Sequence, residues 1–168
     1  MDKLATRAAP SIRSFQVQAP IVFAPNVQLT HLKSWRDPYG FYRPMMKALK
    51  SQPNTGPVVF LPNVVSPAAT IEERSKQLSE NLARKRDELG SDRMHLITHS
   101  FAGIDARAAI SLHGADSAVQ SLSTIATPHT GMRLIQQLRD RPSKDDMRFM
   151  EKAFAVVGLG VKNVNEFS

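Results

Sequence analysis

Four short apolar runs, alternating with segments of helical character, constrain the fold of this chain most strongly. Each run is largely continuous rather than alternating, which is typical of strands that are buried on both faces of a sheet. Strands that are joined by crossover helices run parallel to one another. The sequence therefore predicts an α/β fold, a mainly parallel sheet with helices on both faces, with strands within residues 20–25, 56–65, 94–99 and 119–127.

The clearest helix is predicted over residues 70–90. Thr70 and Glu73 have the spacing of a capping box at its start, and Gly90 is suited to end it. Other helices are expected within residues 39–50, beginning near Pro44, and within residues 101–113, 131–140 and 144–160.

Length and composition bound the class of protein. The 168 residues suffice for one domain with its own core, and the 42% of hydrophobic and 22% of charged residues are ordinary for a globular chain. Because the chain has no cysteine, disulfides, thiolate metal sites and cysteine nucleophiles are excluded. No apolar run reaches the roughly twenty residues of a membrane-spanning helix. We expect neither a metal nor a cofactor.

The formal charge of +7 is concentrated in the first fifty residues, which carry eight basic and two acidic side chains. A basic segment of this kind suits an anionic membrane surface or a nucleic acid. Since no helix-turn-helix, zinc finger or aromatic-basic platform accompanies it, nucleic-acid binding is not expected. Contact with a lipid surface stays open.

Residues 1–18 are expected to form a flexible N-terminal tail or a transit-like segment, followed by a domain over residues 19–168. They hold arginines and serines with a single acid, Asp2, a composition similar to that of a mitochondrial signal. Pro10 interrupts the amphipathic helix that such a signal forms. The apolar stretch of a secretory signal is missing. We therefore expect an intracellular protein, cytoplasmic or mitochondrial.

The stretch MHLITHSFAG at residues 94–103 has the pattern of a nucleophile turn. In such a turn a strand passes to a helix through a serine, whose hydroxyl stands above the sheet edge near the helix N-terminus. The close approach of strand and helix demands small residues two positions before and after the serine. Ala102 meets this demand, whereas Thr98 departs from it. The alternative role for Ser100 is structural, as the N-cap of the helix.

The surroundings of this turn resemble the α/β-hydrolase triacylglycerol lipases, of the bacterial true-lipase type and its eukaryotic relatives. Four segments carry the resemblance in the order of that family: PIVFAPN (20–26), YGFY (39–42), MHLITHSFAGIDARAAI (94–110) and SLSTIATPHTG (121–131). They are similar to the first strand with its oxyanion loop, the aromatic segment before the next helix, the nucleophile strand with its elbow, and the next strand with its T-P-H-x-G loop. A fainter similarity to the lid-helix region lies in residues 163–168.

The resemblance implies hydrolysis of acyl esters of lipids through an acyl-serine intermediate, with Ser100 as the nucleophile. It also implies two backbone N–H donors for the oxyanion, those of Phe101 and Val27. Where the family has histidine and glycine before the second donor, this chain has Pro25 and Asn26. Proline lacks an N–H, and asparagine adopts unusual backbone angles less readily than glycine.

An acid and then a histidine base follow the serine in α/β-hydrolases. In the family that this chain resembles, both lie beyond the T-P-H-x-G loop, and this chain has no histidine after His129. The triad acid is therefore not identifiable. His129 is the best substitute base, because neighbouring parallel strands end on the same side of the sheet. The other histidines, which are less well placed, are His31, His95, His99 and His113.

Two functions of different classes follow. The first is a lipase- or carboxylesterase-like serine hydrolase that acts on a lipid or small acyl ester, with this chain as its N-terminal portion, truncated at the C-terminus. The second is a non-catalytic, truncated α/β-hydrolase-like protein or pseudoenzyme with a binding role. We expect weak or absent activity from the chain as it stands. The strand within residues 121–127 is expected to be a sheet edge.

Overall fold

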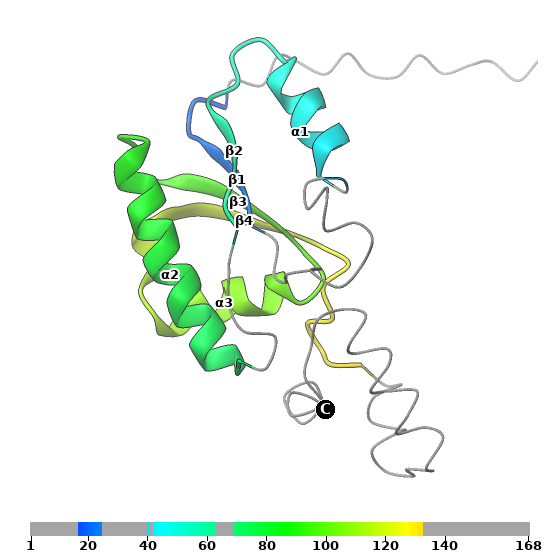
Figure 1. Ribbon diagram of the computed structural model, residues 1–168, viewed down its shortest axis with the longest axis vertical. Coiled ribbons are helices and arrows are strands. Elements are labelled where there is room, and N and C mark those ends of the chain that lie inside the picture. Colours follow the sequence, from blue (N-terminus) through cyan, green and yellow to red (C-terminus); the bar gives the residue numbers. More distant parts are fainter. Residues whose placement is uncertain (1–16, 25–39, 41, 63–68, 133–168) are drawn as a thin grey trace, which may run out of the picture.

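The computed structural model describes residues 17–24, 40, 42–62 and 69–132 of the chain (Figure 1). Within them, strands and helices alternate along the sequence, as the apolar runs predict. The elements are β1 (Ile21–Phe23), α1 (Arg43–Lys50), β2 (Val58–Phe60), α2 (Ile71–Glu88), β3 (Met94–His99), α3 (Ala102–Leu112), a short 3₁₀ helix η2 (Ala115–Ser117) and β4 (Val119–Ile125).

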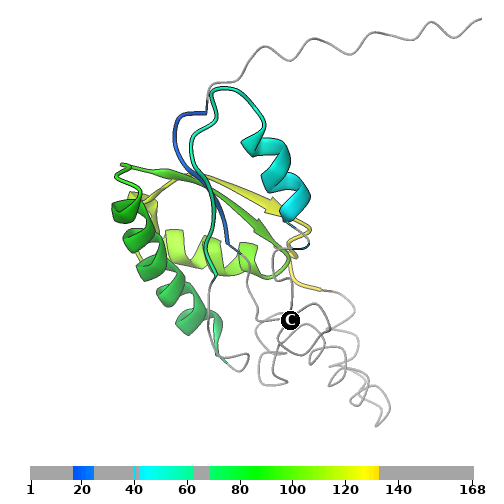
Figure 2. The ribbon, with the colours of Figure 1, turned by 45° about the horizontal axis from the view of Figure 1, so that its top comes forward.

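The four strands form one parallel sheet in the order β2-β1-β3-β4. Ile21 of β1 lies between Val58 of β2 and His95 of β3. The chain thus adds β2 on one side of β1 and then crosses to the other side to add β3. Figures 1 and 2 show α1 on one face of the sheet and α2 with α3 on the other. The predicted parallel sheet with helices on both faces is confirmed.

Each face of the sheet has its own hydrophobic core. On the side of α2 and α3, the fully buried Val22, Met94 and Leu96 of the sheet pack with Leu78 and Leu82 of α2. Leu78 and Leu82 are four residues apart, so they lie on one face of the helix, as the sequence predicts. Burial of these side chains holds α2 against the strand that leads to Ser100.

On the side of α1 the core is aromatic. Tyr42, just before α1, packs edge-to-face on Phe23 and on Phe60, with ring centroids 5.5 and 5.8 Å apart. Burial raises the pKa of Tyr42 to about 12. Met45 and Leu49 complete this cluster from α1.

The apolar runs predict strands that are buried on both faces. This prediction is confirmed for β1 and is wrong for β4. All three residues of β1 are buried, whereas Gln120, Ser121 and Ser123 of β4 are exposed. The reason is position in the sheet, since α1 packs beside β1 and β2 and leaves one face of β4 to solvent. Within the described residues, β4 is an edge strand, as expected.

The helix boundaries follow the local signals. Thr70 caps α2: its Oγ1 accepts from the Glu73 backbone N–H at 3.2 Å, and the Thr70 N–H donates to the Glu73 carboxylate at 2.8 Å. The predicted capping box is therefore confirmed. Gly90 follows the helix with a φ of +57°, a left-handed conformation that glycine adopts at little cost.

Several sequence-based expectations lie outside the described residues. They are the tail at residues 1–16, the helices beyond residue 132, the lid-like segment at 163–168, His31, and the oxyanion-loop residues Pro25, Asn26 and Val27. The boundary between residues 18 and 19 stays a prediction.

A candidate active site at the end of the third strand

Ser100 lies at the sharp turn between β3 and α3. Its φ is +57°, in the left-handed region that non-glycine residues rarely adopt. Holding a serine there costs about 1–3 kcal/mol, so the surroundings must enforce the conformation. The turn stands at the carboxyl end of β3, where the strand order reverses between β1 and β3. Open parallel sheets bind their ligands at this kind of position.

Ser100 is not the N-cap of α3, so the structural alternative is wrong. The helix begins at Ala102, Phe101 occupies the N-cap position, and no side chain makes a capping hydrogen bond there. Within the described residues, no hydrogen bond of the Ser100 side chain was found. The Ser100 hydroxyl therefore has no structural task at the helix end.

The backbone of Ser100 is held from the end of β4. The Ser100 N–H donates to the Ile125 carbonyl oxygen at 2.8 Å. The Ser100 carbonyl oxygen accepts from the Thr127 hydroxyl at 2.7 Å and from the Gly103 N–H at 3.1 Å. These bonds fix the turn between the neighbouring strand and the first turn of α3.

The packing around the turn explains its small residues. Ala102 is buried, and a Cβ atom added to Gly103 would come within 2.2 Å of the Thr127 Oγ1. Thr98, the departure from the usual pattern, is fully buried on the side of α2 and α3. Its branched side chain fits, but its hydroxyl has no hydrogen-bond partner in the described part of the chain.

The first predicted oxyanion donor lies next to the nucleophile. Phe101 directly follows Ser100, is buried, and stands at the start of α3. A helix N-terminus carries a partial positive charge, which favours a developing negative charge beside Ser100. The second predicted donor, Val27, lies outside the described residues.

His129 lies in the loop after β4, where both of its ring nitrogens are engaged. Nδ1 is 3.1 Å from a guanidinium nitrogen of Arg107 on α3, and Nε2 is 3.0 Å from the hydroxyl of Thr124 on β4. A guanidinium only donates, so Nδ1 accepts and the neutral ring carries its proton on Nε2. Among the described residues, the partners of these two nitrogens are thus Arg107 and Thr124, not Ser100.

The other described histidines are spread over the fold. His95 and His99 share the sheet face of α1, and the His95 Nδ1 is 2.7 Å from the Ser121 hydroxyl. Burial lowers the pKa of His99 below its ordinary value. His113 ends α3, remote from the turn, with Nε2 3.5 Å from a Glu72 carboxylate oxygen. The structure thus does not bring a described histidine to the Ser100 hydroxyl.

Sequence reasoning missed a buried ion pair below the turn. Arg74 on α2 and Asp105 on α3 are nearly inaccessible to solvent, and the Arg74 Nε lies 3.1 and 3.0 Å from the two Asp105 oxygens. The two residues are 31 positions apart, so no local pattern indicates the pairing. Asp105 lies in the first turn of α3, so the pair helps to fix the helix that follows Ser100.

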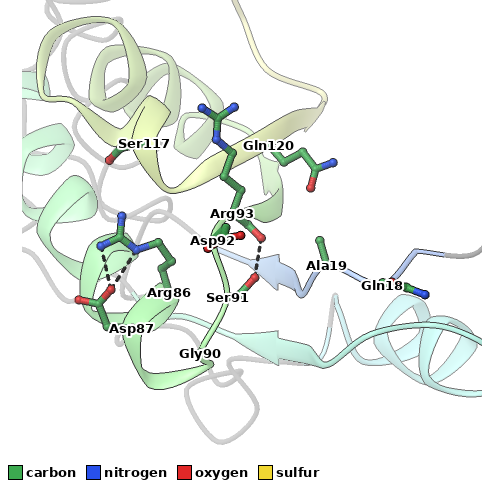
Figure 3. Close-up of a pocket in the computed structure, with 10 residues that line it drawn as sticks. All are labelled: Gln18, Ala19, Arg86, Asp87, Gly90, Ser91, Asp92, Arg93, Ser117 and Gln120. Atoms are coloured by element: carbon green, nitrogen blue, oxygen red, sulfur yellow. Dashed lines mark hydrogen bonds and ion pairs between the residues drawn. The ribbon is translucent and has the colours of Figure 1, made fainter.

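A polar hollow of about 970 Å³ lies at the opposite edge of the sheet (Figure 3). Its lining includes Gln18 and Ala19 before β1, residues 91–93 before β3, and Gln120 near the start of β4. These positions are at the amino ends of the strands, whereas Ser100 is at the carboxyl end. The hollow is therefore separate from the candidate active site.

The described residues also bear on metal sites and on membrane spans. No group of three or more histidine, aspartate or glutamate side chains is placed to hold a metal ion there. In the same residues, no helix has both the length and the apolar character needed to cross a membrane.

The sequence matches no protein-family model and no curated protein. Its fold is similar to that of solved structures of the Bacillus licheniformis lipase BlEst2. The mature form is 19% identical, with a TM-score of 0.65, over 95% of this chain and 58% of the lipase chain. The propeptide form is 22% identical, with a TM-score of 0.60, over 89% of this chain and 31% of that chain.

The chain spans less than two thirds of the length of either lipase chain. At these identities the likeness concerns the fold. Together with the parallel sheet and the order of its elements, it shows that this chain has an α/β-hydrolase-like fold, as the sequence predicts.

Proposed function

We propose that this chain carries the nucleophile portion of a lipase- or carboxylesterase-like serine hydrolase that acts on acyl esters of lipids. The observation that carries the proposal is the left-handed backbone of Ser100 at the carboxyl end of β3. Strained residues of this kind cluster at functional sites, where the surrounding contacts enforce them. The likeness to a lipase fold supports the reaction class.

In the proposed reaction the Ser100 oxygen attacks the carbonyl carbon of the ester and passes its proton to a base. The bond to the alcohol then breaks, the alcohol leaves with a proton, and an acyl-serine remains. Water hydrolyses the acyl-serine and restores the hydroxyl. The N–H groups of Phe101 and Val27 are the proposed donors to the negative oxygen.

The base is the open part of this mechanism. His129 as a substitute base stays a prediction, and its hydrogen bonds to Arg107 and Thr124 would have to break before it could accept the Ser100 proton. This observation favours the second candidate function, a non-catalytic α/β-hydrolase-like protein or pseudoenzyme with a binding role. The two candidates differ in whether Ser100 becomes acylated.

Contact with a lipid surface is proposed through α1. Its exposed Arg43, Lys47 and Lys50 are spaced i, i+4 and i+7, so they form one stripe along the helix, and α1 contains no acidic residue. We name Arg43, Lys47 and Lys50 the basic stripe. Each cation near an anionic lipid surface contributes about 1 kcal/mol to binding, so the stripe favours such a surface.

Acylation by a chromogenic ester tests the hydrolase proposal. The protein is incubated with p-nitrophenyl butyrate, and intact-mass spectrometry detects a butyryl adduct. We expect a Ser100-bound adduct, which Ser100→Ala abolishes. The absence of an adduct on Ser100 would favour the non-catalytic alternative.

Ser121→Ala is the matched control. Ser121 is an exposed serine on β4 and has a histidine nitrogen within hydrogen-bond distance, but it lacks the strand-to-helix turn of the half-buried Ser100. The Ser121→Ala variant is expected to acylate like the unchanged protein. Acylation that persists in Ser100→Ala and vanishes in Ser121→Ala would identify Ser121 as the acylated residue and contradict the proposal.

A further inference from the structure

The loop that follows β4 begins with another non-glycine residue in the left-handed region. Ala126 has a φ of +50°, left-handed like Ser100. The next residue, Thr127, donates its hydroxyl to the Ser100 carbonyl oxygen at 2.7 Å. Thr127 thus follows one strained residue in the chain and is hydrogen-bonded to the other. Its contacts can therefore offset the conformational free energy that both left-handed residues cost.

The Thr127 side chain is held tightly against α3. A Cβ added to Gly103 would come within 2.2 Å of the Thr127 Oγ1, 2.7 Å of its Cγ2 and 2.9 Å of its Cβ. All three side-chain atoms therefore lie against the glycine. Because a β-branched side chain has few rotamers, this contact fixes the direction of the hydroxyl toward Ser100.

The remainder of the loop is anchored on two elements. His129 joins Arg107 of α3 to Thr124 of β4 through its two ring nitrogens. Within the loop, the His129 N–H donates to the Thr127 carbonyl oxygen at 2.9 Å, and the Gly131 N–H donates to the Pro128 carbonyl oxygen at 3.1 Å. The loop therefore presents Thr127 from a fixed position.

We propose that Thr127 is a positioning residue for Ser100, whose hydroxyl and packing on Gly103 hold the nucleophile turn in its left-handed conformation. This inference rests on the proposed role of Ser100. His129, with Arg107, anchors the loop that carries Thr127. The task of the loop is to keep the Ser100 side chain at the N-terminus of α3, where the helix favours the negative form of the nucleophile.

The position of the side chain at residue 100 can be tested with a single introduced thiol, whose reactivity does not require a catalytic base. The chain has no cysteine, so Ser100→Cys introduces a single thiol at the turn. Helix N-termini lower the pKa of cysteine thiols. The rate of alkylation by iodoacetamide as a function of pH gives the pH midpoint of this thiol, which reports how well the side chain is held at the helix start.

Two substitutions of Thr127 are compared in the Ser100→Cys protein. Thr127→Val keeps the shape and loses the hydroxyl, and we expect the midpoint to rise by about half a unit to one unit. Thr127→Ser keeps the hydroxyl and is expected to leave the midpoint close to that of the parent. Thr127→Ala, a second variant without the hydroxyl, is expected to shift the midpoint in the same direction as Thr127→Val.

Ser79→Ala is the matched control for lost stability. The Ser79 hydroxyl donates to the His113 carbonyl oxygen at 2.7 Å, the same kind of bond at the same length, far from the turn. This variant is expected to leave the thiol midpoint unchanged. Equal midpoints in the parent, Thr127→Val and Thr127→Ala would overturn the inference, as would an equal shift caused by Ser79→Ala.

A double-mutant cycle tests the contact with Gly103. In the Ser100→Cys protein, Gly103→Ala pushes the Thr127 side chain away, so it should raise the midpoint as Thr127→Val does. Because both changes remove the same hydrogen bond, the double variant should shift no further than either single variant. Additive shifts would contradict a shared contact.

The alkylation readout separates this inference from the proposed function. A Thr127-dependent midpoint without acylation of Ser100 would leave the positioning role standing and remove the hydrolase proposal. If Ser100 is acylated but the thiol midpoint is the same with and without the Thr127 hydroxyl, the hydrolase proposal would stand and the positioning role of Thr127 would be removed.

Discussion

The Arg74 Nε on α2 donates to both carboxylate oxygens of Asp105 on α3, although the two side chains are almost fully buried. The Arg74 guanidinium also donates to the Ala69 carbonyl oxygen just before α2. Since Asp105 lies in the first turn of α3, its negative charge is also favoured by the helix N-terminus. The pair ties α2 to the start of the helix that follows Ser100.

Removing one partner of this pair should destabilise the fold strongly. Asp105→Ala leaves the Arg74 guanidinium buried without its countercharge, and we expect the free energy of unfolding to fall by about 3–5 kcal/mol. Urea unfolding followed by far-UV circular dichroism measures the change. In the Asp105→Ala protein, the further change Arg74→Met should lower the free energy of unfolding less than Arg74→Met does in the unchanged protein. The reason is that it removes a buried positive charge that has already lost its partner. Additive losses would contradict a direct coupling.

Thr98→Val should stabilise the protein. The Thr98 hydroxyl is fully buried and has no hydrogen-bond partner among the described residues, and such a burial costs about 1–3 kcal/mol. Valine has the same shape without the hydroxyl, so the free energy of unfolding should rise by a similar amount. Thr98→Ser, which keeps the hydroxyl and loses a methyl group, should lower it. A destabilised Thr98→Val protein would show that the hydroxyl has a partner.

His99 should make stability depend on pH. Burial lowers its pKa in the folded chain below the ordinary value of 6.5. The unfolded chain therefore binds a proton at a higher pH than the folded chain does. The stability that neutral His99 contributes is complete above pH 6.5 and is lost as the pH falls through the lowered folded pKa.

Urea unfolding at pH 7.5 and 5.5 measures this loss. The free energy of unfolding should fall less between the two values in His99→Gln than in the unchanged protein. His95→Gln, on the same face of the same strand, is the control for the loss of an imidazole from β3. Equal pH dependence in His99→Gln and the unchanged protein would count against this assignment.

The basic stripe should promote binding to anionic lipid. Cosedimentation with phosphatidylserine-containing vesicles is expected to exceed that with phosphatidylcholine alone. Reversing both Lys47 and Lys50 to glutamate should lower the affinity about tenfold or more. Reversing both Lys76 and Arg84, which are exposed on α2 across the sheet, to glutamate changes the net charge by the same amount and is the matched control. An equal loss from this α2 variant would point to net charge rather than to the stripe.

The elements with local signals were predictable from the sequence. The capping box of Thr70 and Glu73 places the start of α2, and Gly90 marks its end. The apolar run of β3, followed by Ser100 and small residues, places the turn and the beginning of α3. These features depend on neighbours a few residues away, so the sequence displays them directly.

The contacts that define the candidate site join distant residues. Thr127 lies 27 positions from Ser100, and His129 lies 22 positions from Arg107. Their meeting depends on the register of β4 beside β3 and on the path of the loop after it. Sequence reasoning placed His129 on the correct side of the sheet, but the choice of Arg107 as its partner depends on tertiary packing.

Fluorophosphonate labelling is the most direct measurement of the central claim, that Ser100 is a nucleophile held in a strained turn. The chain is treated with a fluorophosphonate probe, digested, and mapped by mass spectrometry, beside its Ser100→Ala and Ser121→Ala variants. We predict a slow, single phosphonyl adduct on Ser100, retained in Ser121→Ala and lost in Ser100→Ala. Folded protein that gains no adduct on Ser100, or whose total labelling is the same in Ser100→Ala as in the unchanged protein, would contradict the claim.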